Sequence, residues 1–175
     1  MTKPEQSPLS FPVVVTDVPP KGLDVVVEAD ERERAAVAAD FDLPSIQSLV
    51  GRFHIGHTSL GLRVTGAVKA RITQICAVSL EPFEADVAEE VEVDFADPAT
   101  LSPTPSDGPA ADDPPDPIVN GAIDLGALTA EFLALGVDPY PRKPGVDFTF
   151  DDSVDREKMS PFAKLVQLRP DGGKK

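Results

Sequence analysis

The sequence predicts an α+β protein: an antiparallel β-meander with one solvated face, helices packed on the other face, and a long disordered proline-rich loop. Three successive segments alternate apolar and polar residues with a period of two, which is typical of strands buried on one face only. Two other segments combine helix-forming residues with capping signals at their starts. A proline-rich run between the meander and the second helix has little apolar surface to bury.

The chain length of 175 residues suits one domain. We expect disordered tails at residues 1–10 and 169–175, and one α+β domain over residues 11–168. That domain is interrupted at residues 97–117, where seven of 21 residues are proline. We interpret this segment as a disordered, acidic loop.

The N-terminal third is expected to contain a strand and a helix. A short apolar run at Phe11–Val15 is followed by a turn at Asp17–Gly22 and by the β-rich segment Leu23–Glu28. Asp30 then lies at the N-cap position of a helix whose acidic residues fall in the first turn. Leu43-Pro44 marks the end of that helix.

The meander is predicted from three alternating segments, Ser48–Ile55, Leu62–Ile72 and Glu84–Phe95. In each segment most of the residues at every second position are suited to burial, while the intervening residues are mostly polar or charged. The residues expected on the dry face are Leu49, Gly51, Phe53, Ile55, Leu62, Val64, Val68, Ala70, Ile72, Ala85, Val87, Val91, Val93 and Phe95.

A second helix is predicted over Ile123–Val137, with Asp124 as its cap and Gly136 as its stop. We expect it to pack on the dry face of the meander. Beyond it, Asp138–Gly145 is expected to be extended, and Ser160–Leu168 is short and amphipathic. The apolar residues at helical spacing are Leu125, Leu128, Phe132 and Leu135.

Negative charge is concentrated in the middle of the chain. The net charge is −14, and between Arg71 and Arg142 there are 15 acidic residues and no lysine or arginine. Such a block repels phosphate backbones and attracts basic partners through long-range forces. The alternative is a solvated acidic segment that only keeps the protein soluble. The candidate partner-binding acids are Glu81, Glu84, Asp86, Glu90, Glu92, Asp94, Asp112, Asp113 and Asp116.

Basic residues form a candidate stripe on the solvated face of the meander. A basic stripe on a sheet can bind RNA phosphates. If the two long strands pair antiparallel, however, the same residues meet the acidic positions of Glu84–Asp94 and form cross-strand ion pairs. We favour ion pairing, because adjacent acids cancel most of the positive potential. The candidate RNA-binding residues are Arg52, His54, Arg63, Lys69 and Arg71.

Groups suited to catalysis or metal binding are few. His54 and His57 are the only histidines, and two ligands do not make a structural zinc site. Cys76 has Ser79 where a second cysteine would complete a C-x-x-C pair, and we interpret Cys76 as a half-buried residue at a strand end. No glycine-rich phosphate-binding or nucleophile motif occurs. We expect no catalytic activity, metal, cofactor or small-molecule substrate; an enzyme built without these motifs is the alternative.

The sequence contains no stretch that resembles a secretion signal or a membrane span. The first ten residues are polar, and no apolar run approaches the roughly 18 residues that a spanning helix needs. With one cysteine, the chain cannot form an internal disulfide bond. We therefore expect a cytoplasmic protein without membrane contact.

Several separated pieces of the chain resemble a known family when taken in order. They are ARITQICAVSLEPFEADVAEEVEVDF (70–95), the acidic proline-rich loop, GAIDLGALTAEFLALGVDPYPRKPG (121–145) and SPFAKLVQL (160–168). This ordered set resembles the YceD-like large ribosomal RNA subunit accumulation proteins over about two-thirds of the chain. The N-terminal FPVVVTDVPPKGLDVVVEAD resembles the opening of alphaproteobacterial members.

The resemblance implies a role in the accumulation and processing of large-subunit ribosomal RNA, without an established catalytic activity. Many members have C-x-x-C before a Pro-Phe pair; the replacement by Ser79 removes the argument for a metal or redox role here. The terminal asparagine-proline-phenylalanine pattern of the family appears as Ser160-Pro161-Phe162. The positions that match the family motifs are Cys76, Pro82, Phe83, Asp124, Leu125, Pro161, Phe162, Leu165 and Leu168.

We therefore expect a non-enzymatic accessory factor of ribosome biogenesis. Its partner would be a basic ribosomal protein or a large-subunit assembly intermediate, bound through the acidic residues. The alternative is a protein that binds ribosomal RNA directly with the basic stripe.

Overall fold

The computed structural model describes residues 7–99 and 114–146. The chain divides into a unit of Met1–Lys143 and a unit of Pro144–Lys175, and the elements below all belong to the first unit. Residues 100–113 of the loop predicted at 97–117, the predicted amphipathic segment Ser160–Leu168 and the predicted tail at 169–175 lie outside the described residues. None of the helices in the described part is long and apolar enough to cross a membrane.

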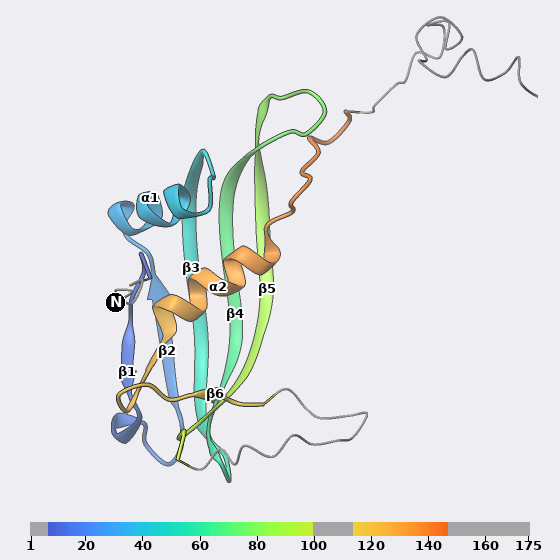
Figure 1. Ribbon diagram of the computed structural model, residues 1–175. Helices are drawn as coiled ribbons and strands as arrows, with labels where there is room; N and C mark the ends of the chain where they lie inside the picture. The colour runs from blue at the N-terminus through green and yellow to red at the C-terminus, as the bar shows by residue number, and fades with distance from the viewer. Residues whose placement is uncertain (1–6, 100–113, 147–175) are drawn as a thin grey trace, which may run out of the picture. The chain divides into compact units, whose positions relative to one another are not determined.

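The main sheet has five strands in the order β2-β3-β4-β5-β6 (Figure 1). Its first four strands pair antiparallel, which confirms the predicted meander and adds β2 to it. β6 pairs parallel with the end of β5. The strands are β2 (Leu23–Glu28), β3 (Ser45–His57), β4 (Gly61–Ile75), β5 (Pro82–Ala96) and β6 (Asp116–Pro117).

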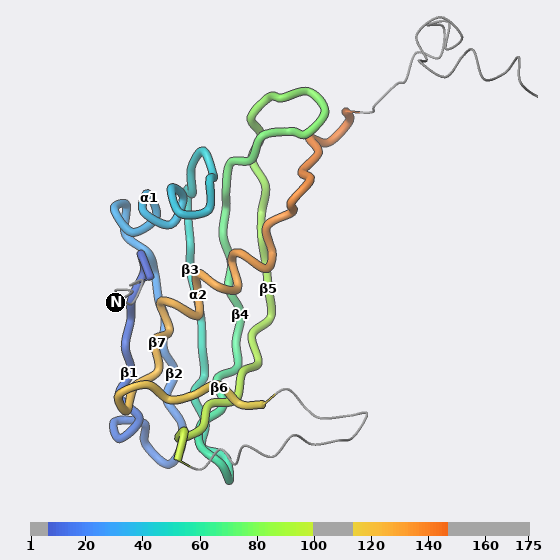
Figure 2. Tube along the Cα trace, viewed as in Figure 1, coloured from blue at the N-terminus to red at the C-terminus, as the bar shows by residue number. Residues whose placement is uncertain are grey.

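A small second sheet joins the start of the chain to the start of the second helix. β1 (Pro12–Val14) pairs antiparallel with β7 (Ala122–Asp124), as Figure 2 shows, and a 3-10 turn at Val15–Asp17 follows β1. The predicted tail at residues 1–10 is too long at its inner end, because Leu9 is buried in the core with only 2% of its surface exposed.

The first helix, α1 (Glu31–Asp40), begins as the sequence predicts. Asp30 accepts hydrogen bonds from the backbone N–H groups of Arg32 and Glu33, and the Glu33 carboxylate accepts from the backbone N–H of Asp30. This reciprocal capping box satisfies N–H groups that have no partner inside the helix. Val37 and Ala38 are the buried residues of α1, which packs against β3.

The second helix, α2 (Leu125–Gly136), crosses the sheet in front of its strands (Figure 1). It begins two residues later than predicted, because Ile123 is in β7. Leu133 is fully buried, whereas Leu135, which we expected to pack, is 69% exposed. α2 ends over β5, where Gly136 lies close to the Val87 side chain, so Leu135 has no further strand beneath it.

The core lies between the inner face of the sheet and α2. The predicted dry-face residues of β4 are all buried, as are Leu49, Phe53 and Ile55 of β3. Gly51 lets α2 approach the sheet, because a Cβ atom there would lie 2.7 Å from the Thr129 hydroxyl oxygen. The buried β4 residues are Leu62, Val64, Val68, Ala70 and Ile72.

Asp124 connects the N-terminal segment to the start of α2. Its Oδ1 atom accepts hydrogen bonds from the backbone N–H groups of Phe11 (2.7 Å), Gly126 (2.9 Å) and Ala127 (3.1 Å). Its Oδ2 atom accepts from the Ser10 hydroxyl at 2.7 Å. Partial burial opposes ionisation, but these hydrogen bonds outweigh it and hold the pKa of the Asp124 carboxyl below its usual value.

Replacing Asp124 by alanine should therefore destabilise the protein. The change removes a helix cap and two charge-assisted hydrogen bonds to the N-terminal segment, so we expect a loss of about 2–3 kcal/mol at neutral pH. Urea unfolding followed by circular dichroism measures it. Asp40→Ala is the matched control, because Asp40 is exposed at the end of α1; equal losses in the two variants would contradict the role of Asp124.

The native chain and Asp124→Ala together test the ionisation of Asp124. A carboxyl whose pKa is lower in the folded state contributes stability that is fully present above its unfolded pKa of roughly 3.9. That contribution is lost as the pH falls through the lowered folded pKa. The stability difference between the native chain and Asp124→Ala should stay constant above about pH 5 and shrink below about pH 4. A difference that grows on acidification would contradict this.

Candidate functional site: the outer face of the sheet and its β5 edge

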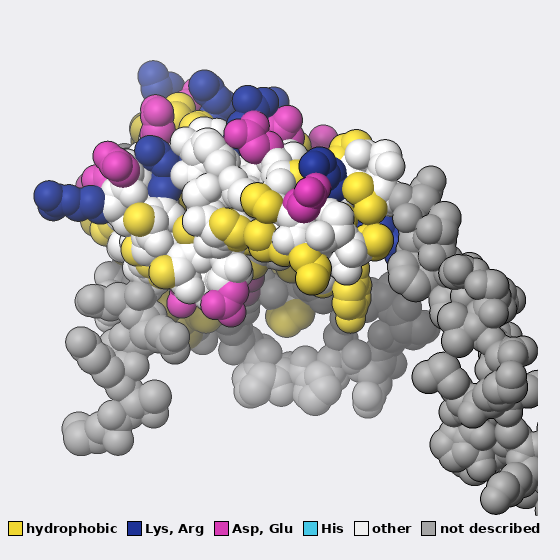
Figure 3. Space-filling model, turned by 90° about the horizontal axis from the view of Figure 1, so that it is seen from above, with side chains coloured by type: hydrophobic (Ala, Val, Ile, Leu, Met, Phe, Trp, Pro, Cys, Tyr) yellow, Lys and Arg dark blue, Asp and Glu magenta, His cyan; other side chains and the backbone are white. Residues whose placement is uncertain are grey.

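The outer face of the main sheet carries the charged residues that the sequence singles out. In β5 these are the even-numbered acids, and in β3 and β4 they are basic residues at the intervening positions. Viewed from above, acidic and basic side chains lie next to one another along the upper rim (Figure 3). The outer-face acids of β5 are Glu84, Asp86, Glu90, Glu92 and Asp94.

Two of the predicted basic residues are paired with β5 acids. The Arg63 guanidinium donates to both carboxylate oxygens of Asp94 at 2.7 Å and to Glu92 at 3.1 Å. Arg71 donates to Asp86 from Nε at 2.9 Å. These hydrogen bonds hold the pKa values of Asp86 and Asp94 below their usual range. The cross-strand ion pairing that we favoured therefore occurs at both arginines.

Ion pairing leaves the β5 side of the face acidic. Arg63 and Arg71 together meet three of the five outer-face acids. Glu84 and Glu90 are exposed and have no ion-pair partner among the described residues. The paired Glu92 and Asp86 side chains are still 69% and 71% exposed. Both carboxylates therefore remain accessible to a partner.

Parallel pairing of β6 brings a distant acid to this edge. Asp116 lies opposite Phe95, which places it beside Glu92 and Asp94 around a hollow of about 690 Å³. Arg63 and the Pro114-Pro115 pair complete its lining. Of the remaining predicted acids, Asp112 and Asp113 lie outside the described residues. Glu81 lies at the other end of β5 and pairs with Lys143 at 2.9 Å.

The other predicted basic residues are divided between a contact with an acid and an open hollow. His54 contacts Asp24 through Nδ1 at 2.7 Å. Arg52 and Lys69 line a hollow of about 680 Å³ on the outer face. Neither residue has an ion-pair partner among those the structure describes. Arg71 and Asp86 also line this hollow, together with Val50, Ala67 and Ala88.

The two histidines have different partners in the structure. His54 is engaged by Asp24, whereas His57 contacts the Val18 carbonyl oxygen at 3.2 Å. Within residues 7–99 and 114–146, no cluster of three or more potential ligands is suited to a metal ion.

Cys76 is fully buried directly after β4, not half-buried as predicted. Its Sγ atom accepts hydrogen bonds from the backbone N–H groups of Ser79 and Lys143, both at 3.4 Å. Ala77 N–H also donates to the Pro141 carbonyl oxygen, at 2.8 Å. The turn after β4 and the segment after α2 therefore close around the sulfur. Hydrogen bonds from the Ser79 side chain and backbone and from the Lys143 backbone lower the pKa of the Cys76 thiol to about 6, against the effect of burial.

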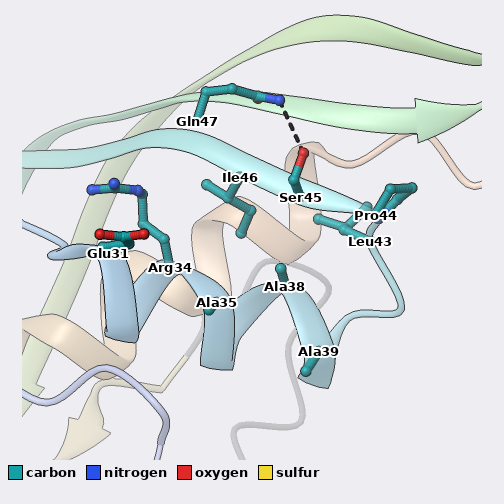
Figure 4. A pocket seen from close by; sticks show the side chains of 10 residues that line it. All are labelled: Glu31, Arg34, Ala35, Ala38, Ala39, Leu43, Pro44, Ser45, Ile46 and Gln47. Atoms are coloured by element: carbon teal, nitrogen blue, oxygen red, sulfur yellow. Dashed lines mark hydrogen bonds between the residues drawn. The ribbon is translucent and has the colours of Figure 1, made fainter.

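A further hollow of about 450 Å³, which the sequence did not indicate, lies between α1 and the start of β3 (Figure 4). Small side chains leave this space, because Ala35, Ala38 and Ala39 face it from the helix. Its polar end is closed by a hydrogen bond from Gln47 to Ser45.

The single cysteine makes its ionisation measurable. Thiolate ultraviolet absorbance reports on Cys76 alone, because the chain has no other cysteine. We expect a midpoint near pH 6 in the folded protein, and near the ordinary value of about 8.5 in urea. A folded midpoint at or above the unfolded one would show that burial outweighs the hydrogen bonds.

The comparisons with known proteins place this architecture in a family. The family model described as large ribosomal RNA subunit accumulation protein YceD matches residues 64–169. No curated protein and no solved structure matches the chain. Within the match, Pro82-Phe83 starts β5 and Asp124-Leu125 starts α2. Pro161, Phe162, Leu165 and Leu168 lie outside the described residues. Because the match covers more than half of the chain, the protein belongs to the YceD family.

Proposed function

We propose that this protein is a non-enzymatic accessory factor that supports the accumulation of large-subunit ribosomal RNA. It acts by binding a basic ribosomal protein, or an assembly intermediate that exposes one, through the acidic side of its main sheet. The family name supplies the connection to large-subunit RNA. The same proposal places the protein in the cytoplasm, where bacterial ribosomal subunits assemble.

The acidity of the β5 edge is the observation that carries the proposal. Glu84 and Glu90 are exposed without ion-pair partners among the described residues, and Glu92, Asp94 and Asp116 surround one hollow. A lysine or arginine entering this hollow would meet several carboxylates with a single competing cation, Arg63. Field lines from clustered carboxylates attract a cationic partner and speed its association at low ionic strength.

The net charge of −14 supports a protein partner over RNA. An RNA chain would have to approach a strongly negative protein. Two of the protein's candidate RNA-binding arginines, Arg63 and Arg71, already form ion pairs with carboxylates. Basic ribosomal proteins carry the complementary sign. Asp112 and Asp113 belong to the same acidic segment of the sequence, and we include them in the proposed binding region.

Direct RNA binding remains the second candidate, because one observation favours it. Arg52 and Lys69 lie together in the outer-face hollow without ion-pair partners among the described residues. Two cations with small apolar neighbours can hold a phosphate and the sugar next to it.

Sedimentation tests the proposed acidic mode of binding. Tagged protein mixed with isolated large subunits or their precursors should travel with them through a sucrose gradient at low salt. Removing three charges with Glu84→Gln, Glu90→Gln and Glu92→Gln should weaken the affinity, measured from the bound fraction at several subunit concentrations, by about tenfold. Each lost rim contact costs a few tenths to about 1 kcal/mol.

The matched control removes three charges elsewhere on the molecule. Glu31→Gln, Asp40→Asn and Asp42→Asn change the net charge by the same amount but lie at α1 and the turn after it, away from β5. This control should bind nearly as well as the native protein. Equal binding by all three proteins would reject the β5 acids as the contact, and absence of the native protein from the subunit fractions would reject the function itself.

A gel-shift assay with large-subunit RNA fragments separates the two candidates. We expect no shift at low salt, where phosphate contacts are strongest. A shift that disappears in Arg52→Ala combined with Lys69→Ala would instead establish RNA binding through the outer-face hollow.

A further inference from the structure

The register of β5 determines where its backbone groups point. At one end of the β4–β5 ladder, Cys76 N–H donates to the carbonyl oxygen of Glu81, so odd-numbered residues of β5 face β4. At the other end, Ile118 N–H donates to the carbonyl oxygen of Ala96, so even-numbered residues face away from β4. The register between these ends has no shift. In a strand, N–H and C=O of one residue point to the same side.

Even-numbered residues from Glu84 to Glu92 therefore direct their backbone N–H and C=O groups away from the sheet. Within the described residues, β6 is the only strand on this side, and it pairs with Phe95 and Ala96 alone. No hydrogen bond from another described residue reaches the backbone of residues 84–92 on this side. The segment after α2 forms hydrogen bonds with the end of β4 and with the turn that follows β4.

The free edge and the acidic side chains belong to the same residues. Glu84, Asp86, Glu90 and Glu92 each present an exposed carboxylate on the outer face, and their outward backbone groups have no partner among residues 7–99 and 114–146. A strand added here would pair its backbone with theirs and place alternate side chains beside the carboxylates. Lysine or arginine at every second position of that strand would meet an acid at four of the five outer-face positions from Glu84 to Glu92, the exception being Ala88.

Charge also argues against a second copy of this chain as the occupant. Two β5 edges brought together would place like charges opposite one another, which is destabilising and is a common way in which edge strands avoid self-pairing. Glu89, on the inner face of the same strand beside Gly136, adds a further negative charge to the edge. The features that repel a copy attract a basic strand.

We propose that residues 84–92 of β5 form a docking edge at which an extended basic segment of a partner protein adds a strand to the sheet. This inference rests on the proposed function and specifies how the partner is held. Backbone hydrogen bonds supply the affinity, and the alternating carboxylates select a segment with cations at every second residue.

A synthetic peptide of alternating lysine and valine, about ten residues long, is a suitable probe. Two control peptides have the same charge and the same number of added methyl groups. One is N-methylated at every lysine and the other at every valine. Only one set of N–H groups can face β5, so only one of the two controls should lose binding, by about tenfold or more in fluorescence anisotropy.

A variant of the protein tests the same edge. Ala88→Pro removes one outward N–H group, leaves the β4 ladder and all charges unchanged, and should weaken peptide binding about three- to tenfold. Ala88→Val is the matched control and should bind like the native chain. Thermal unfolding checks that both variants fold. If Ala88→Pro does not fold, amide exchange of Asp86, Ala88 and Glu90 in the native protein decides, because these amides should become protected only when the peptide is added.

The outcomes separate this inference from the proposed function. Strand addition is overturned if the unmodified peptide does not bind, or if neither or both of the methylated peptides lose binding. In that case, subunit binding that still depends on the β5 charges leaves the proposed function standing. Protection of these amides in the free protein would overturn it too, since this chain or a second copy would then occupy the edge. If only one methylated peptide loses binding and the full chain does not bind large subunits, the docking edge is supported and the proposed function is rejected.

Discussion

The unbroken register between β4 and β5 is the constraint on which the rest of the structure depends. From Gly61 opposite Ala96 to Ile75 opposite Pro82 there is no bulge, so the period of two is kept along the whole ladder. Inner-face residues such as Val64 and Val91 then all meet α2 and the core. A shift by one residue would turn the five outer-face carboxylates of β5 inward, at a large cost in desolvation.

The same register places both paired and unpaired acids on the outer face of the sheet, so its negative charge is only partly neutralised. Arg63 and Arg71 lie directly opposite Asp94 and Asp86, so each forms a cross-strand ion pair. Ala67 lies opposite Glu90, which therefore has no basic partner directly across the strand pair. The ion pairs favour one register, while the unmatched acids leave the β5 edge negatively charged. Exposed ion pairs of this kind contribute little to stability.

Local chemistry made much of the fold predictable. Asp30 and Asp124 precede helices at positions where a carboxylate satisfies free N–H groups, and both cap as expected. Alternation identified the three long strands, although β3 extends beyond its predicted bounds. The β-rich segment that became β2 was not expected to pair with the meander. The failures were of another kind. Leu135 has the spacing of a packing residue but lies past the edge of the covered sheet, and Leu9 is buried because its segment pairs with residues more than a hundred positions away.

The sequence by itself determined the period of the strands, the helix caps, the excess of negative charge and the family, because each depends on neighbouring residues or on composition. Only the tertiary structure decided which acids are paired and that Asp116 returns to lie beside Glu92 and Asp94. It also decided that the outer-face acids of β5 are residues whose backbone groups point away from β4. These features depend on strand order and register, which are set by burying the inner face against α2 and not by any local preference of the chain.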